Sequence, residues 1–220
     1  MDLIIEPKKR IDWLDVGTGN GVFAINYARF IAFYLLPTTP INLWLNDIKI
    51  DREDIRVKME VTDSVNLNVH FPVESSADKI PFAKGAFNFI TARHLLHWMN
   101  FDSQQRALEE IQRVSAENSI ILLDVATPFN AVVAFETYHS RLNHGLGIEV
   151  DHPRYEQMYF PKTEHLNKML QRLFPNHTVT AYPYIGDFPN NLGITNPQKP
   201  HRYTNGVEEN VVFIAAPRKF

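Results

Sequence analysis

The residues best suited to chemistry lie in the stretch Asp15-Val16-Gly17-Thr18-Gly19-Asn20-Gly21. The stretch follows the apolar run 11–14 and precedes the apolar residues 22–25, a pattern that predicts a strand, a glycine turn and a helix start. Glycine at every second position lets the backbone take positive φ and approach a ligand closely. The first N–H groups of the helix have no partner within it and carry partial positive charge. The stretch therefore predicts a binding site for a nucleotide-like ligand.

Two details discriminate between ligands of this kind. A dinucleotide fingerprint needs G-x-G-x-x-G, but the sixth position here is Val22, so the spacing disfavours a nicotinamide enzyme. The carboxylate of Asp15 at the end of the strand would repel a pyrophosphate and can attract a cationic amino-acid head group. S-adenosylmethionine carries an ammonium and a sulfonium and no phosphate, so its charge suits this site.

The stretch Asp15–Gly21 resembles the first motif of class I S-adenosylmethionine-dependent methyltransferases. The stretch Ser75–Phe82 is similar to an acid-containing loop of their small-molecule, type 11-like branch. The resemblance extends over about residues 11–174. It implies an α/β, doubly wound, Rossmann-like sheet of seven strands with the last antiparallel, in a single domain over 1–220. It also implies S-adenosylmethionine as cofactor. The residues that we expect to bind it are Asp15, Gly17, Thr18, Gly19, Asn20, Gly21, Asp47, Ser76, Ala77, Asp78 and Arg93.

Asp47 follows the expected strand 41–45. In a doubly wound sheet, ligands bind beyond the carboxyl ends of the strands. Asp47 is therefore placed to accept hydrogen bonds from both hydroxyls of a ribose. Asp51 and Asp54 lie nearby and compete for this role.

The loop 75–82 is the expected adenine site. The family often has an acid where Ser76 falls in this chain, and that acid binds the adenine amino group. Here the hydroxyl of Ser76 or the carboxylate of Asp78 would take that role. Asn88 likewise stands where the family usually has an aspartate.

Two histidines are the candidate general bases. Methyl transfer from a sulfonium mainly requires the protein to align the nucleophile, and a base helps when that nucleophile carries a proton. His94 and His97 follow the fourth expected strand and lie three residues apart, so one helical turn would put both on one side. The alternative is that one of them caps or packs a short helix. A metal site is not expected, because no third ligand stands at a suitable spacing.

Several further elements must position these residues. Strands are expected at 11–16, 41–45, 69–73, 86–92, 120–125, 178–185 and 211–215, and helices at 21–36, 51–64, 130–142 and 163–173, with another helix carrying Leu108, Ile111 and Val114. The helix 21–36 is apolar nearly all round, so we expect it to be buried. Residues 102–105 have the spacing of a capping box, and Asn118 is expected in a left-handed turn. Residues 143–160 are expected to be irregular.

Composition bounds the class of protein. With 220 residues of which 45% are hydrophobic, the chain can build one large core, and a net charge of −3 does not favour nucleic-acid binding. The absence of cysteine excludes disulfides and fits a reducing compartment. Residues 1–10 contain an apolar run of only three residues, which is too short for a signal peptide, and the longest apolar stretch, 30–36, is too short to span a membrane. We expect a cytoplasmic protein that acts on a small molecule and binds neither nucleic acid nor membrane; an oligomer is compatible with the sequence.

An alternative function is a non-catalytic S-adenosylmethionine-binding regulatory protein or subunit. The replaced acids at Ser76 and Asn88 motivate it. In addition, only ten residues precede the first expected strand, whereas the family usually has helices there that cover the substrate. We therefore expect residues 129–160 and the long loop 186–210 to form the substrate lid.

Overall fold

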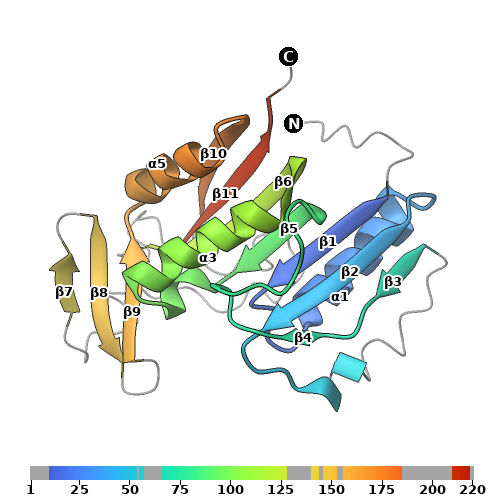
Figure 1. Ribbon diagram of the computed structural model, residues 1–220, viewed down its shortest axis with the longest axis horizontal. Helices are drawn as coiled ribbons and strands as arrows, with labels where there is room; N and C mark the ends of the chain where they lie inside the picture. The colour runs from blue at the N-terminus through green and yellow to red at the C-terminus, as the bar shows by residue number, and fades with distance from the viewer. Residues whose placement is uncertain are drawn as a thin grey trace, which may run out of the picture. The chain divides into compact units, whose positions relative to one another are not determined.

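The computed structural model describes residues 10–53, 55–56, 66–127, 140–143, 146–152, 156–184 and 210–218 (Figure 1). The strands of the main sheet are β1 (Ile11–Val16), β2 (Ile41–Asp47), β3 (Leu67–Val69), β4 (Val73–Glu74), β5 (Phe87–Arg93), β6 (Ser115–Ala126), β10 (His177–Tyr184) and β11 (Asn210–Pro217). The helices are α1 (Val22–Phe30), which continues as a π-helical turn Ile31–Leu35, the 3-10 turn Leu96–Trp98, α3 (Phe101–Val114) and α5 (Thr163–Leu173).

The main sheet has the order β10-β11-β6-β5-β1-β2-β3, with β4 pairing further along β2. Strand β1 is parallel to both of its neighbours, β2 and β5, and β10 pairs with β11 in the antiparallel sense. The predicted α/β sheet with a parallel core and an antiparallel final strand is confirmed. The described residues cluster in two compact units, the first up to Ala92 with 109–121 and the second comprising 93–108 and the chain from 122 onward.

The third predicted strand, 69–73, is wrong as a continuous element. It is split into β3 and β4, which pair with different parts of β2. Pro72 stands immediately before β4, and its lack of an N–H prevents it from donating to a strand ladder. The sheet therefore has eight strands where seven were predicted.

Helix α1 packs against the sheet through small residues. Ala24, Ala28 and Ala32, together with Ile25, are buried against alternate residues of β1 and β2, and Figure 1 shows the helix behind these strands. The expectation that the whole helix is buried is wrong, because Phe33 is 71% exposed and other large side chains of the segment are also exposed. Small side chains let the helix approach the sheet, so its aromatic residues are left on the outer side.

Aromatic rings along this segment contact one another. The rings of Phe23 and Tyr27 stack at 5.4 Å between centroids, and those of Phe30 and Tyr34 lie 5.3 Å apart.

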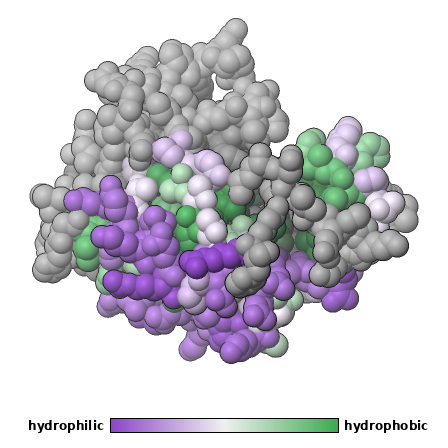
Figure 2. All heavy atoms as spheres, turned by 90° about the horizontal axis from the view of Figure 1, so that it is seen from above, coloured by the Kyte–Doolittle hydropathy of each residue, from purple (hydrophilic) through white to green (hydrophobic). Residues whose placement is uncertain are grey.

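On the face seen in Figure 2, the described apolar residues lie in separate patches between hydrophilic ones.

Successive strand residues point to opposite faces of a sheet, so the face opposite α1 carries Asp12, Asn42 and Asn68. Asn42 donates to Asp12 at 2.9 Å and Asn68 donates to Asn42 at 3.3 Å. Asn88 accepts from the backbone N–H of Asp12 at 3.0 Å and donates to the carbonyl of Arg10 at 2.8 Å. Asn88 therefore joins neighbouring strands at this polar face.

Helix α3 begins differently from the prediction. Asn100 Oδ1 accepts a hydrogen bond from the backbone N–H of Ser103 at 2.9 Å, so Asn100 and not Asp102 caps the helix. The predicted apolar stripe Leu108, Ile111 and Val114 is fully buried. The predicted left-handed turn at Asn118 is wrong, because β6 begins at Ser115 and runs through it.

A second, antiparallel sheet was not predicted. It consists of β7 (Ser140–Asn143), β8 (Gly147–His152) and β9 (Glu156–Pro161) in the order β7-β8-β9. The expectations of irregular structure over 143–160 and of helix at 140–142 are therefore wrong, whereas 130–139 lie outside the described residues. Gly147 is required in β8, because a Cβ there would lie 2.5 Å from the carbonyl oxygen of Phe160.

Helix α5 has the predicted bounds and buries Leu166 and Leu170, and it packs on β10 and β11. Of the predicted helix 51–64, the described residues 52–53 and 55–56 are helical. The loop 186–210 lies outside the described residues except Asn210, which begins β11. Within the described ranges, no helix is long and apolar enough to cross a membrane.

Candidate functional site

The glycine turn has the predicted backbone. Gly17, Gly19 and Gly21 have φ values of 72°, 57° and 72°, a region that disfavours residues with a side chain. A Cβ at Gly21 would touch Ile25 at 3.3 Å, so this glycine allows close packing. At Gly19, by contrast, no described atom lies within 4 Å of the position that a Cβ would take, so open space adjoins the turn.

Asn46, the penultimate residue of β2, anchors the turn. Its carbonyl oxygen accepts from the N–H groups of both Gly17 and Thr18, at 2.8 and 3.0 Å. Its side-chain amide donates to Ser75 Oγ at 2.6 Å and to the carbonyl of Val73 at 3.1 Å. Asn46 thus ties the glycine turn to the start of the loop 75–82, a role that the sequence analysis missed.

Asp47, the predicted ribose acid, lies beside the turn. Its Oδ2 accepts from the backbone N–H of Gly19 at 2.8 Å, and its Oδ1 accepts from that of Lys49 at 3.3 Å. A carboxylate offers about four lone-pair sites, so capacity remains for ligand hydroxyls. The competitor Asp51 lies at the start of the helical residues that follow, where its carbonyl accepts from the N–H of Ile55, and Asp54 is outside the described residues.

Asp15 is buried, with 4% of its surface exposed. Thr91 on β5 donates its hydroxyl to Asp15 Oδ1 at 2.5 Å and accepts from the indole N–H of Trp13 at 2.7 Å. The register that pairs Asp15 with Thr91 creates this arrangement. The hydroxyl fixes the direction of the carboxylate at the base of the glycine turn.

One polar atom in the turn itself lacks a partner. Thr18 Oγ1 is shielded from solvent and makes no hydrogen bond to any described residue. Buried polar atoms in folded proteins are nearly always paired, so an atom of this kind indicates a place where a ligand or water bonds.

The predicted adenine loop is held firmly. Ser75 donates its N–H to the carbonyl of Asp47 at 2.9 Å, and Lys79 donates to that of Ser76 at 3.0 Å. Ala77 is buried, whereas Ser76 and Asp78 are partly exposed. The loop therefore begins beside the end of β2, where the predicted ribose acid stands.

His94 and Arg93 share one buried acid. Arg93 Nε lies 3.3 Å and His94 Nε2 lies 3.4 Å from Asp124 Oδ2, and Asp124 is 1% exposed. Among the described residues, His94 is the one non-glycine residue with positive φ, at 48°. Such a conformation costs about 1–3 kcal/mol and tends to occur at functional positions. The sequence did not indicate Asp124, because only the fold brings it to His94.

His97 occupies a different environment. It is 6% exposed, and its ring stacks on Phe160 at 5.5 Å. Burial, with the nearby His94, lowers its pKa to about 3. His97 is therefore neutral at neutral pH and poorly able to accept a proton, which favours the packing alternative. Within the described ranges, no three His, Asp or Glu side chains form a cluster that could hold a metal ion.

Comparison with known protein families shows to which family the chain belongs. The profile of a methyltransferase domain family matches residues 2–173, a span that contains the glycine turn, Asp47, the loop 75–82 and both histidines. The chain belongs to this family. A search of curated protein sequences found no significant match.

Several solved structures have a fold similar to that of this chain. A 1,6-didemethyltoxoflavin-N1-methyltransferase from Burkholderia thailandensis, with bound 1,6-didemethyltoxoflavin and S-adenosylhomocysteine, is 12% identical at a TM-score of 0.57, over 96% of this chain and 72% of that one. A SAM-dependent methyltransferase from Methanosarcina mazei is 14% identical at a TM-score of 0.57, over 95% of this chain and 92% of that one. The [4+2]-cyclase SpnF is 17% identical at a TM-score of 0.54, over 80% of this chain and 54% of that one. At such identities the likeness establishes the fold alone.

Proposed function

We propose that this methyltransferase domain binds S-adenosylmethionine at the turn Gly17–Gly21 and transfers its methyl group to a small molecule. The observation that carries the proposal is the contact between Asp47 and the N–H of Gly19, at 2.8 Å, beside the open space over that glycine. A carboxylate at the end of β2 and an unobstructed glycine turn at the end of β1 suit a ribose and the chain of an amino acid. The unpartnered Thr18 Oγ1 gives the turn a further polar group for a ligand.

Each predicted residue has a distinct role in this proposal. Asp47 accepts from the ribose hydroxyls, and Ser76 or Asp78 accepts from the adenine amino group. The buried carboxylate of Asp15 attracts the ammonium, because charges interact more strongly where water is excluded. When bound, the cofactor supplies an electrophilic methyl group. Arg93 is also proposed to bind the cofactor, although its guanidinium contacts Asp124 in this structure.

His94 is the better candidate base of the two histidines. Its side chain is 33% exposed, so it can meet a substrate, and Asp124 orients its ring through Nε2. An acid behind an imidazole fixes the orientation of its ring. His94 would take a proton from an acceptor that carries one, whereas His97 is assigned to packing.

The acceptor is proposed to be a small molecule and the location cytoplasmic. The first of these is supported by the Burkholderia enzyme, whose structure holds 1,6-didemethyltoxoflavin. The second is supported by the cysteine-free sequence, which fits a reducing compartment. The lid formed by 129–160 and 186–210 stays a prediction, and so does the single domain over 1–220.

A second candidate is a protein that binds S-adenosylmethionine without transferring its methyl group. Ser76 stands where the family often has an acid. In addition, one structure of similar fold is named a cyclase, so the fold is compatible with other chemistry.

Two measurements separate these candidates. Titration calorimetry with S-adenosylhomocysteine tests the cofactor site, and we expect saturable one-to-one binding. Incubation with labelled S-adenosylmethionine and a panel of small-molecule acceptors then tests transfer, which mass spectrometry detects as a gain of one methyl group. Absence of binding would refute both candidates, whereas binding with no transfer to any acceptor would favour the second.

A further inference from the structure

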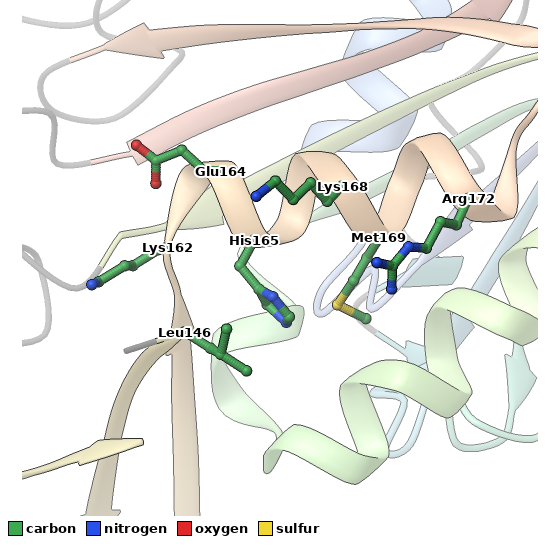
Figure 3. Close-up of a pocket in the computed structure, with 7 residues that line it drawn as sticks. All are labelled: Leu146, Lys162, Glu164, His165, Lys168, Met169 and Arg172. Atoms are coloured by element: carbon green, nitrogen blue, oxygen red, sulfur yellow. The ribbon is translucent and has the colours of Figure 1, made fainter. Parts of the chain in front are cut away.

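A hollow of about 530 Å³ lies on the second unit, along one side of α5 (Figure 3). This volume falls within the range of small-molecule sites. It is lined by Leu146, Lys162, Glu164, His165, Lys168, Met169 and Arg172. None of these residues belongs to the proposed cofactor or catalytic set.

The sequence of α5 explains why this side is available. Leu166 and Leu170 are buried on the opposite side of the helix. His165, Met169 and Arg172 follow the helical spacing of three and four residues, and Figure 3 shows all three directed to the same side. Two of the lining residues are joined by a backbone hydrogen bond, from the N–H of Lys162 to the carbonyl of Leu146, at 2.8 Å.

The hollow is strongly cationic. Lys162, Lys168 and Arg172 contribute three positive charges, and within the described part of the chain none of them forms an ion pair or a side-chain hydrogen bond. Glu164 is the one acid among the lining residues, and Figure 3 shows its carboxylate and the ammonium of Lys162 both directed away from Arg172, so Lys168 and Arg172 are the two cations nearest to His165 along the helix. Like charges gathered in this way repel one another, so an anion between them is favoured.

His165 adds a polar atom that lacks a partner. Its Nε2 is shielded from solvent and bonds to no described residue. Burial, followed by the charges of Arg172 and Lys168, lowers its pKa, so the imidazole is neutral at neutral pH and can donate one N–H. The ring lies 6.0 Å from that of Phe101, and Leu146 and Met169 provide apolar surface beside it.

We propose that this hollow is a second ligand site, which binds a small organic anion consisting of a carboxylate or phosphate attached to an apolar group. The anionic head lies between Lys168 and Arg172 and accepts a hydrogen bond from His165. The apolar group packs on Leu146 and Met169. Carboxylate and phosphate share the chemistry that the cations recognise, so the test must distinguish them.

The test is an NMR titration that follows the imidazole of His165 and the methyl group of Met169. The probes are benzoate, phenyl phosphate and, as a neutral control, phenol. We expect the preferred anion to give saturable shifts at both residues and phenol to give none. Whichever of the two anions binds more tightly identifies the head group.

A pair of double variants provides the matched comparison. Lys168→Ala with Arg172→Ala should weaken anion binding by at least about tenfold, whereas Lys84→Ala with Arg52→Ala, which removes the same two charge types elsewhere, should leave it unchanged. Arg172→Gln alone should weaken binding less and serves if the double variant does not fold. Circular dichroism checks the fold of each variant.

The proposal is overturned if neither anion shifts His165 and Met169, if phenol shifts them equally, or if removal of Lys168 and Arg172 charges leaves the affinity unchanged. The titration is run with and without S-adenosylhomocysteine and uses no methyl acceptor. Failure of the anion site is therefore distinguishable from failure of the proposed function. If S-adenosylhomocysteine displaces the anions and the anions cause no NMR shifts at α5 residues, the anions bind at the cofactor site and the proposed site on this helix is refuted.

Discussion

Glu110 and Arg113 hold the two polar groups of a single residue, Ile80. The backbone N–H of Ile80 donates to Glu110 at 2.9 Å, and its carbonyl accepts from Arg113 at 2.7 Å. The two side chains pair with each other at 2.6 and 2.8 Å, and Arg113 also donates to the carbonyl of Phe82. The hydrogen bond from Arg113 lowers the pKa of Glu110. One turn of α3 thus fixes the end of the proposed adenine loop.

Arg113→Ala should therefore weaken cofactor binding without touching the cofactor. The loop loses its hydrogen bonds to Arg113, each worth about 0.5–1.5 kcal/mol, so we expect lower stability and a several-fold weaker affinity for S-adenosylhomocysteine. Urea unfolding and calorimetry measure the two effects. Gln112→Ala, at the exposed position beside Arg113 on the same helix, is the control and should change neither. Equal behaviour of the two variants would exclude the positioning role.

Gly19→Val should abolish binding of S-adenosylhomocysteine, because the side chain would occupy the open space over the turn. Valine at a φ of 57° is also strained, so some stability will be lost. Gly85→Val isolates this strain, since Gly85 has a φ of 71° and lies outside the proposed site. We expect both variants to unfold at lower urea concentration but only Gly19→Val to lose binding in calorimetry. Retained affinity in Gly19→Val would remove the turn from the site.

Asp47→Ala should weaken the binding of S-adenosylhomocysteine by about 1.5–3 kcal/mol, the range for a hydrogen bond to a charged group. This corresponds to about ten- to more than a hundredfold in dissociation constant, measured by calorimetry. Asp51→Ala is the control, because Asp51 was the competing acid in the sequence. If Asp51→Ala weakens binding and Asp47→Ala does not, the ribose site is assigned to the wrong residue.

The parts of the fold that sequence predicts well are those encoded by neighbouring residues. The run 11–16 and the glycines after it specify a strand and a turn with positive φ, and both occur. Asp47 reaches Gly19 because parallel strands end at the same edge of the sheet, which follows from the fold class. The exposed aromatic residues of α1 were not predictable from the periodicity, because the closely packed face consists of alanines.

The contacts that the sequence did not reveal depend on strand register and helix docking. Thr91 meets Asp15 only through the register of β5 on β1, and Asp124 meets His94 only after β6 is placed. A residue of α3 reaches Ile80 across 33 positions of the chain. Sequence spacing carries no signal for such pairs, since each depends on how separate elements pack.

The buried His97 should make the folded protein less stable at acidic pH. Its pKa is about 3 in the folded chain and 6.5 when unperturbed, so below about pH 6.5 the unfolded chain binds a proton that the folded chain excludes. Stability must therefore fall as the pH is lowered from about 6.5 towards 3, because the unfolded state binds more protons. One proton accounts for at most about 1.4 kcal/mol per pH unit.

His97→Phe should flatten this pH dependence, because phenylalanine cannot bind a proton and keeps a ring to stack on Phe160. The measurement is the free energy of urea unfolding at several pH values between about 7 and 4, where the variant should gain stability relative to the original protein as the pH falls. His70→Phe is the control. Burial also lowers the pKa of His70, but its partly exposed ring keeps contact with water, so the slope should change less. Parallel curves for the original protein and His97→Phe would mean that His97 binds its proton equally well in the folded and the unfolded chain, and the packing assignment would then be wrong.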